Sequence, residues 1–147
     1  MARFIVSLAV FAVGFVSAIT LEGCSVFNYL DFPSLIIAVV LPFLFVSTLF
    51  GFKEMGRAFS IPLKKEPEKD KLIPALAFFK MYGKATWLAG LVGVISGVIS
   101  MLVNLEDKNQ VGPALALAIV SLLYSGIINL AVIIPFTIFI KKHLKEC

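Results

Sequence analysis

Two long apolar runs decide the fold of this chain: residues 85–103, ATWLAGLVGVISGVISMLV, and residues 111–140, VGPALALAIVSLLYSGIINLAVIIPFTIFI. Neither run contains a charged residue, and a polar turn over residues 104–110 separates them. A run of about 18 or more uncharged apolar residues is long enough to cross a bilayer as a helix. The sequence therefore predicts a helical hairpin that crosses a membrane twice and has its tip in water.

The composition agrees with a membrane protein. Of the 147 residues, 60% are hydrophobic and 15% are charged, and the mean hydropathy is +1.01. A soluble domain is usually about 45–50% apolar. Two further apolar segments, about 4–21 and 32–52, complete the prediction of an all-α, integral membrane protein with four helices. The whole chain, 1–147, is expected to form a single membrane domain.

The first of these segments has a second interpretation. Arg3 followed by an apolar run that ends at residues 16–18 is also typical of a signal peptide, and residues 21–24 hint at a lipoprotein cleavage site. Because Glu22 fits such a cleavage site poorly, we favour an uncleaved first helix over 4–21.

Prolines and length shape the predictions for the second and fourth helices. Asp31 can cap the second helix, with Pro33 in its first turn. Pro42 lies inside that helix and should kink it. The fourth helix, 111–140, would be about 45 Å long at 1.5 Å per residue, longer than a hydrocarbon core of about 30 Å. It must therefore tilt, bend at Pro135 or project beyond the membrane.

The basic residues predict the orientation of the chain. Of the thirteen Lys and Arg, all but Lys108 lie near the N-terminus, in the loop 53–84 or in the C-terminal tail. With four crossings these residues fall on one side of the membrane, which is the positive-inside pattern. Both termini and the loop 53–84 are therefore predicted to be cytoplasmic. That loop is expected to have an amphipathic helical segment at each end and a charged connector at 64–71 between them. The net charge of +4 is attributed to membrane topology rather than to nucleic-acid binding.

The four predicted helices contain no Asp, Glu, Lys, Arg or His. A proton relay or an ion site inside a membrane normally needs such a group, so a partner would have to supply it. His143 in the tail has no second ligand nearby, and Cys24 and Cys147 fall on opposite sides of the predicted membrane. The sequence predicts no metal site, no cofactor and no enzymatic activity.

Small residues recur along the two helices of the hairpin at spacings of three and four, which brings them to one face of each helix. Two interpretations are open: the hairpin packs on itself or on neighbours, or the faces line a shared surface around a partner helix or an ion path. The third helix carries Thr86, Gly90, Gly93, Gly97 and Ser100, and the fourth carries Ala114, Ala118, Ser121, Ser125 and Asn129.

Several short motifs, in order along the chain, resemble those of the MotA flagellar stator proteins, with ExbB and TolQ as wider relatives. The segment Tyr29-x-Asp31-x-Pro33-Ser34 is similar to the start of the MotA second helix. Residues 88–97, LAGLVGVISG, resemble its third-helix motif, and residues 111–118, VGPALALA, resemble the start of its fourth helix. Tyr124 precedes Pro135 by the same spacing as the matching pair in that family.

The resemblance implies an inner-membrane subunit of an ion-driven motor or transport complex. It implies a homopentameric ring in the bacterial inner membrane, surrounded by lipid, around a single-span MotB- or ExbD-like partner whose Asp carries the proton or sodium ion. No nucleic-acid partner is expected. The residues predicted to line the ion path or the partner helix are Thr86, Gly90, Gly93, Gly97, Ser121, Ser125 and Pro135.

Three departures from the family pattern favour an alternative. The long inner domain of MotA is reduced here to roughly thirty residues, Trp87 occupies a proline position, and Val94 and Leu122 stand where threonines lie beside the ion path. Ser121 is adjacent to Leu122 and could substitute for its hydroxyl. The alternative is a non-conducting membrane scaffold or assembly subunit with the same fold. Pro135 is the residue carried over most directly.

Overall fold

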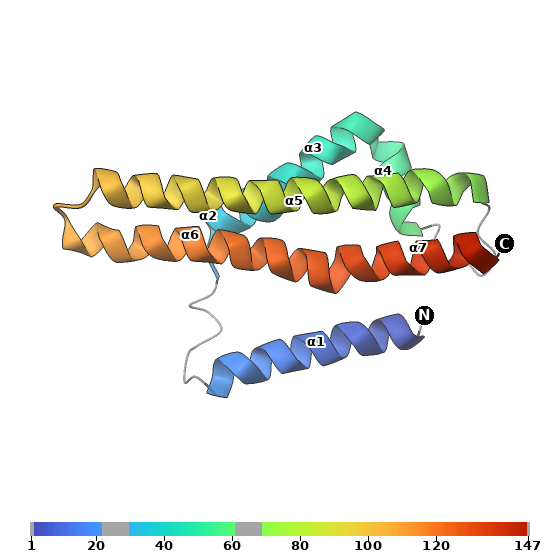
Figure 1. Cartoon of the computed structure of the whole chain (residues 1–147), viewed down its shortest axis with the longest axis horizontal. Coiled ribbons are helices and arrows are strands. Elements are labelled where there is room, and N and C mark those ends of the chain that lie inside the picture. The colour runs from blue at the N-terminus through green and yellow to red at the C-terminus, as the bar shows by residue number, and fades with distance from the viewer. Residues whose placement is uncertain (1, 22–29, 61–68, 147) are drawn as a thin grey trace.

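The structure, a computed structural model, is all-α throughout the residues that it describes, which confirms the predicted class. A long antiparallel hairpin forms its centre, the helices of residues 32–60 lie against it, and the helix of residues 2–21 lies apart from it (Figure 1). The described residues are 2–21, 30–60 and 69–146.

The hairpin consists of two long helical rods. One rod is α5 (Lys69–Val103), and the other joins α6 (Lys108–Ile128), the π-helical turn η4 (Asn129–Ile133) and α7 (Ile134–Glu146) (Figure 1). At the tip, the side chain of Asp107 accepts a hydrogen bond of 3.0 Å from the Asn109 N–H, so α6 begins earlier than the predicted residue 111. The predicted hairpin is present.

The second apolar segment folds into α2 (Phe32–Leu35), the π-helical turn η2 (Ile36–Val40) and α3 (Leu41–Phe50). Asp31 caps it as predicted, because its carboxylate accepts a hydrogen bond of 2.9 Å from the Ser34 N–H. The segment ends at Gly51, whose φ of 84° suits glycine and breaks the predicted continuation to residue 52.

Among the described residues, three helical stretches are long and apolar enough to cross a membrane: Phe32–Phe50, Asp70–Val103 and Asn109–Lys145. The first helix, α1 (Ala2–Leu21), is present as predicted, but its apolar part Ala9–Leu21 is shorter than a typical span. The fourth crossing, the cytoplasmic position of both termini and the ring remain predictions.

The predicted loop 53–84 is largely helical, which corrects the expected boundaries. α4 (Phe52–Ser60) follows α3 after the break, and α5 begins at Lys69 rather than near residue 85. The reason is an apolar stripe at helical spacing, which is buried against α4 and α7 and so stabilises extra turns of α5. The stripe comprises Leu72, Ala75, Phe78, Phe79 and Tyr82. Most of the predicted connector 64–71 lies outside the described residues.

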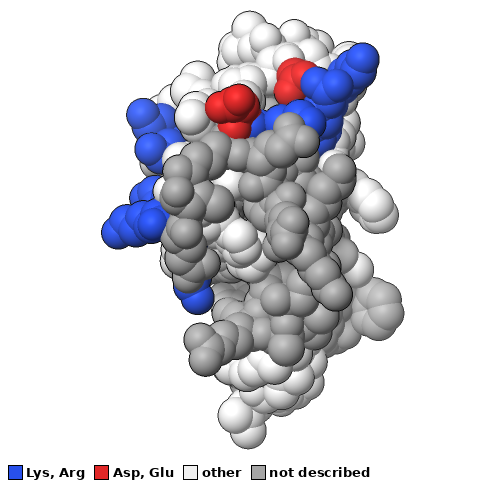
Figure 2. All heavy atoms as spheres, turned by 90° about the vertical axis from the view of Figure 1, so that its right-hand side faces the viewer, with Lys and Arg blue, Asp and Glu red and all other residues white. Residues whose placement is uncertain are grey.

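This stripe is the centre of an aromatic core at the basic end of the hairpin. Phe78 and Phe79 are fully enclosed, and rings from α3, α4 and α7 pack against them with centroid distances between 4.9 and 6.5 Å. Most of these pairs are edge-to-face, the arrangement that aromatic quadrupoles favour. Lys and Arg side chains gather around this end of the molecule (Figure 2).

Candidate functional site

The glycines of α5 allow its backbone to come very close to α6. A Cβ atom added at Gly90 would lie 2.8 Å from the Cβ of Ser125, and one added at Gly93 would lie 2.5 Å from the Cβ of Ser121. At Gly97 the nearest atom would be the Ala118 Cβ, at 2.7 Å. None of these positions can hold a larger residue without movement, so the two small-residue faces pack against each other.

Hydroxyl groups fill the polar positions of this contact. The Ser125 Oγ donates to the Thr86 carbonyl oxygen across the hairpin at 2.9 Å, and the Thr86 Oγ1 donates to the Tyr82 carbonyl oxygen at 2.8 Å. Ser125 and Thr86 are both fully buried. The two rods of the hairpin are therefore joined by a side-chain hydrogen bond as well as by close packing, and both bonds satisfy polar groups that lipid could not.

A third helix joins this polar contact through Ser34 of α2. Its Oγ donates to the Leu117 carbonyl oxygen of α6 at 3.2 Å and lies 3.3 Å from the Ser121 Oγ. Ser121 in turn donates to the same carbonyl at 2.7 Å. Sequence reasoning assigned Ser34 only to a motif, because its partner is 87 residues away along the chain and no local pattern connects them.

The series of buried polar side chains between the two rods ends at Asn129, the first residue of η4. Its Nδ2 donates to the Ser125 carbonyl oxygen at 2.9 Å, and its Oδ1 would lie 3.0 Å from a Cβ at Gly83 of α5. Gly83 is thus a fourth glycine at the contact. It escaped the sequence analysis because it lies within the segment then assigned to the loop.

The π-helical turn η4 keeps the buried face of this rod aligned. Successive buried positions Ser125, Asn129 and Ile133 are four apart, and each such step over-rotates a regular α-helix by about 40°. The wider turn η4 offsets this drift, so that Ile133 and Ile140 also face α5.

Both π-helical turns precede a proline. Each turn ends two residues before a proline: η2 ends just before Leu41-Pro42, and η4 ends just before Ile134-Pro135. In each turn the N–H of the residue before the proline bonds to a carbonyl five residues back, as in Leu41 to Ile36. A π-helical turn thus stands at Pro42, where a kink was predicted, and at Pro135, where a bend was one of three options; at each site proline lacks the donor of a regular helical bond.

The seven predicted site residues fall into two groups. Six of them, Thr86, Gly90, Gly93, Gly97, Ser121 and Ser125, are buried and meet in the contact between α5 and α6. Pro135 is half-buried at the second position of α7 and lies apart from them. In the single chain the six contact each other, which is the geometry of the self-packed hairpin. Their role beside an ion path stays a prediction.

The tail histidine is more enclosed than expected. His143 is half-buried, its ring lies 4.3 Å from that of Phe139, and its Nδ1 lies 3.0 Å from the Phe139 carbonyl oxygen. Within the described part of the chain, no group of three or more His, Cys, Asp or Glu could hold a metal ion.

Comparison with known proteins identifies the family. A model of the MotA/TolQ/ExbB proton channel family matches residues 56–147, which include most of α4 and the whole hairpin. The chain is 33% identical over 57 residues to "Chemotaxis protein PomA" of Vibrio alginolyticus, and 40% identical over 53 residues to "Motility protein A" of Aquifex aeolicus. A "Motility protein A" of Borreliella burgdorferi is 31% identical over 64 residues.

These three alignments cover 39%, 36% and 44% of this chain. They cover only 22%, 21% and 25% of the respective relatives, so the chain matches about a quarter or less of their length. The family match is much broader, because it extends over more than half of the chain. On that ground the chain belongs to the MotA/TolQ/ExbB proton channel family.

Proposed function

We propose that this chain is the multi-span subunit of an ion-driven motor or transport complex in the bacterial inner membrane. It forms a ring, of five subunits by analogy with the family, around a single-span MotB- or ExbD-like partner. The partner's membrane Asp carries the proton or sodium ion. Membership of a proton channel family supports this role and separates the chain from enzymes.

One observation carries the proposal: the close-packed hairpin contains no Asp, Glu, Lys, Arg or His between residues 85 and 103 or between 111 and 140. Its interior is filled by glycine, alanine and hydroxyl contacts. Such a hairpin can form a wall beside an ion path, but it cannot carry the charge itself. A partner that brings a carboxylate completes the chemistry.

The predicted site residues act in this proposal by setting the shape of the wall. Gly90, Gly93 and Gly97 fix the distance between α5 and α6. Ser125 fixes the register of these two helices through its hydrogen bond to Thr86, and Ser121 links α6 to Ser34 of α2. The outward faces of both helices are apolar and exposed, with Ile95 at 58% and Ile119 at 61% exposure. Such faces are available to lipid, to neighbouring subunits and to the partner helix.

A non-conducting scaffold is the second candidate. Val94 and Leu122, which stand where the family pattern has threonines, are both only partly buried. At the surface of a wall they offer no hydroxyl to an ion path. The short segment between α3 and α5 likewise supports a role that needs no large cytoplasmic domain.

The first experiment is to extract the complex intact from membranes and to measure its mass and composition. The motor proposal expects a ring with a single-span protein that carries a membrane Asp. A lone chain, or a ring without such a protein, contradicts it. Ion flux that Ser121→Ala or Pro135→Ala abolishes while the complex stays assembled would exclude the scaffold.

A further inference from the structure

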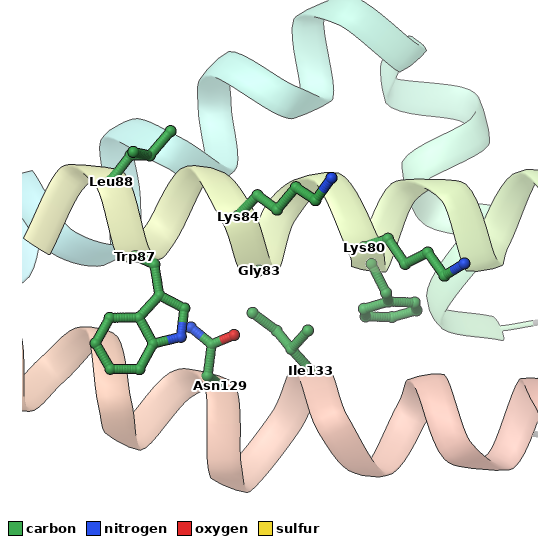
Figure 3. Close-up of a pocket in the computed structure, with 8 residues that line it drawn as sticks. Lys80, Gly83, Lys84, Trp87, Leu88, Asn129 and Ile133 are labelled. Atoms are coloured by element: carbon green, nitrogen blue, oxygen red, sulfur yellow. The ribbon is translucent and has the colours of Figure 1, made fainter.

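A groove of about 550 Å³ opens between α5 and η4 at the basic end of the hairpin. Gly83 and Asn129 lie at its floor, and Trp87 and Ile133 reach into it from opposite sides (Figure 3). Gly83 lets the side chains of Asn129 and Ile133 come close to the backbone of α5 at this point. Gly83 and Asn129 also belong to the packing contact between the two rods, but the proposed ion path does not use the groove.

The groove has a charged end and an apolar end along one face of α5. Lys80, Lys84, Trp87 and Leu88 follow each other at helical spacing, and all four are exposed. Both lysine side chains extend toward the basic end, away from Trp87 (Figure 3). Neither lysine forms a salt bridge with a carboxylate of the described residues. Two cationic groups therefore stand above an apolar slot.

This polarity matches the layers of a membrane. The lysines come immediately before the uncharged run that starts at residue 85, and Trp87 is an aromatic residue of the kind that lies near lipid headgroups. Basic pockets between membrane helices at this depth attract anionic lipid headgroups. The polar Asn129, only 6% exposed, adds an amide at the floor that can bond to a glycerol or ester oxygen.

We propose that this groove binds an anionic phospholipid, with its phosphate between Lys80 and Lys84 and the start of an acyl chain against Trp87 and Leu88. A partner helix fits less well, because a helix is about 10–12 Å across and roughly one turn would fill the volume. Small-ligand sites commonly have volumes of about 300–1,000 Å³. This inference needs the chain to span a membrane, but it does not rest on the proposed motor function.

Trp87 is the only tryptophan in the chain, so its fluorescence reports on this groove without a label. The purified complex is placed in phosphatidylcholine nanodiscs, and lipid with brominated acyl chains is added stepwise as either phosphatidylglycerol or phosphatidylcholine. Bromine quenches tryptophan on contact. We expect phosphatidylglycerol to quench at a much lower mole fraction, with a preference that weakens as salt is added.

The variant K80Q/K84Q should lose about 30-fold in this preference, since each lysine near a membrane surface contributes roughly a fivefold preference for anionic lipid. K53Q/K145Q removes the same charge elsewhere at the basic end and should retain the preference. Thermal unfolding checks that both variants are folded. G83A adds a Cβ that would press on two residues of the groove lining, Asn129 and Ile133, and it should weaken phosphatidylglycerol quenching in a folded protein with both lysines present.

Three outcomes would overturn the proposal. Equal quenching by both lipids would mean that bulk lipid alone covers Trp87. Displacement of phosphatidylglycerol by inorganic phosphate at matched ionic strength would mean that the groove binds a free anion. Protection of Trp87 from both brominated lipids by a protein chain in the complex would assign the groove to that chain.

Discussion

The two ends of α5 pack in opposite ways. From Gly90 to Gly97 the helix meets α6 through backbone, small side chains and hydroxyl groups. From Leu72 to Tyr82 it is surrounded by large apolar and aromatic side chains from α3, α4 and α7. The difference follows from the surroundings that the charge pattern predicts: lipid around the glycine-rich end and water near the basic end.

Within lipid, burying an apolar side chain gains little, because the acyl chains are as apolar as leucine. Close van der Waals contact and buried hydrogen bonds then decide packing, and glycine permits both. Near the basic end, where charged residues mark the approach to water, burial of large aromatic surface is strongly favourable. One helix therefore carries two kinds of packing along its length, and the two should respond differently to mutation.

The largest effect is expected in the aromatic core. Phe78→Ala should lower the free energy of unfolding by about 3–5 kcal/mol, because Phe78 is 1% exposed and contacts three rings on two other helices, α3 and α4. Denaturant unfolding of the purified protein measures the change. Phe52→Ala removes a ring that is 60% exposed and should have little effect. Similar losses for both variants would contradict the assignment of Phe78 to a core.

The next effect tests the close contact. Gly93→Val should lower the free energy of unfolding by about 1–3 kcal/mol, since its side chain would overlap Ser121 and force α5 and α6 apart. Gly126→Val is the matched control, because a Cβ at Gly126 meets nothing within 4 Å. Disulfide trapping between cysteines placed on the two helices measures their separation. If Gly93→Val left both stability and trapping unchanged, the packing described for this end would be wrong.

A smaller effect is expected from a hydrogen bond across the hairpin. Ser125→Ala removes the donor to the Thr86 carbonyl and should cost about 0.6 kcal/mol, the average for such bonds between membrane helices, and at most about 1.7 kcal/mol. Ser96→Ala, at an exposed position of α5, should be neutral. The comparison uses the same unfolding assay, and an equal response of the two variants would show that the bond contributes nothing.

The smallest effect is expected at the boundary between the two regions of the rod. Pro135→Ala should change the free energy of unfolding by less than about 1 kcal/mol, because Asn129 and Ile133 hold the register of η4 from within. Pro33→Ala is the control, because Pro33 lies in the first turn of α2 and does not follow a π-helical turn. Spin-label distances across η4 would reveal a register shift, and a shift would show that proline, rather than packing, sets the turn.

The sequence predicted the part of the fold that depends on local patterns. The uncharged runs, the Asp31 cap and the irregular turns at Pro42 and Pro135 all follow from rules that act over a few residues. The early start of α5 was missed, because only the rings of α4 and α7 reveal that its first turns are buried. Tertiary partners decide such segments more than propensity does.

In the candidate site, too, features set by local spacing were predicted and features set by distant partners were missed. The stripes Gly90–Gly97 and Ser121–Ser125 were found from spacing alone, and the structure brings them together. Spacing could not reveal whether they face each other or a partner, since both arrangements need the same small residues. Ser34 and Gly83 were missed as members of the contact, because their partners are distant in sequence.

The two π-helical turns have a mechanical consequence. η2 approaches α5 at Tyr82, whose hydroxyl donates to the Val39 carbonyl oxygen at 3.4 Å, and η4 approaches it at the next residue, Gly83. Two of the three candidate spans thus depart from regular helical geometry at one level, while α5 passes through it uninterrupted. At that level only α5 keeps regular helical hydrogen bonds and resists bending, so the molecule should bend there more easily than elsewhere.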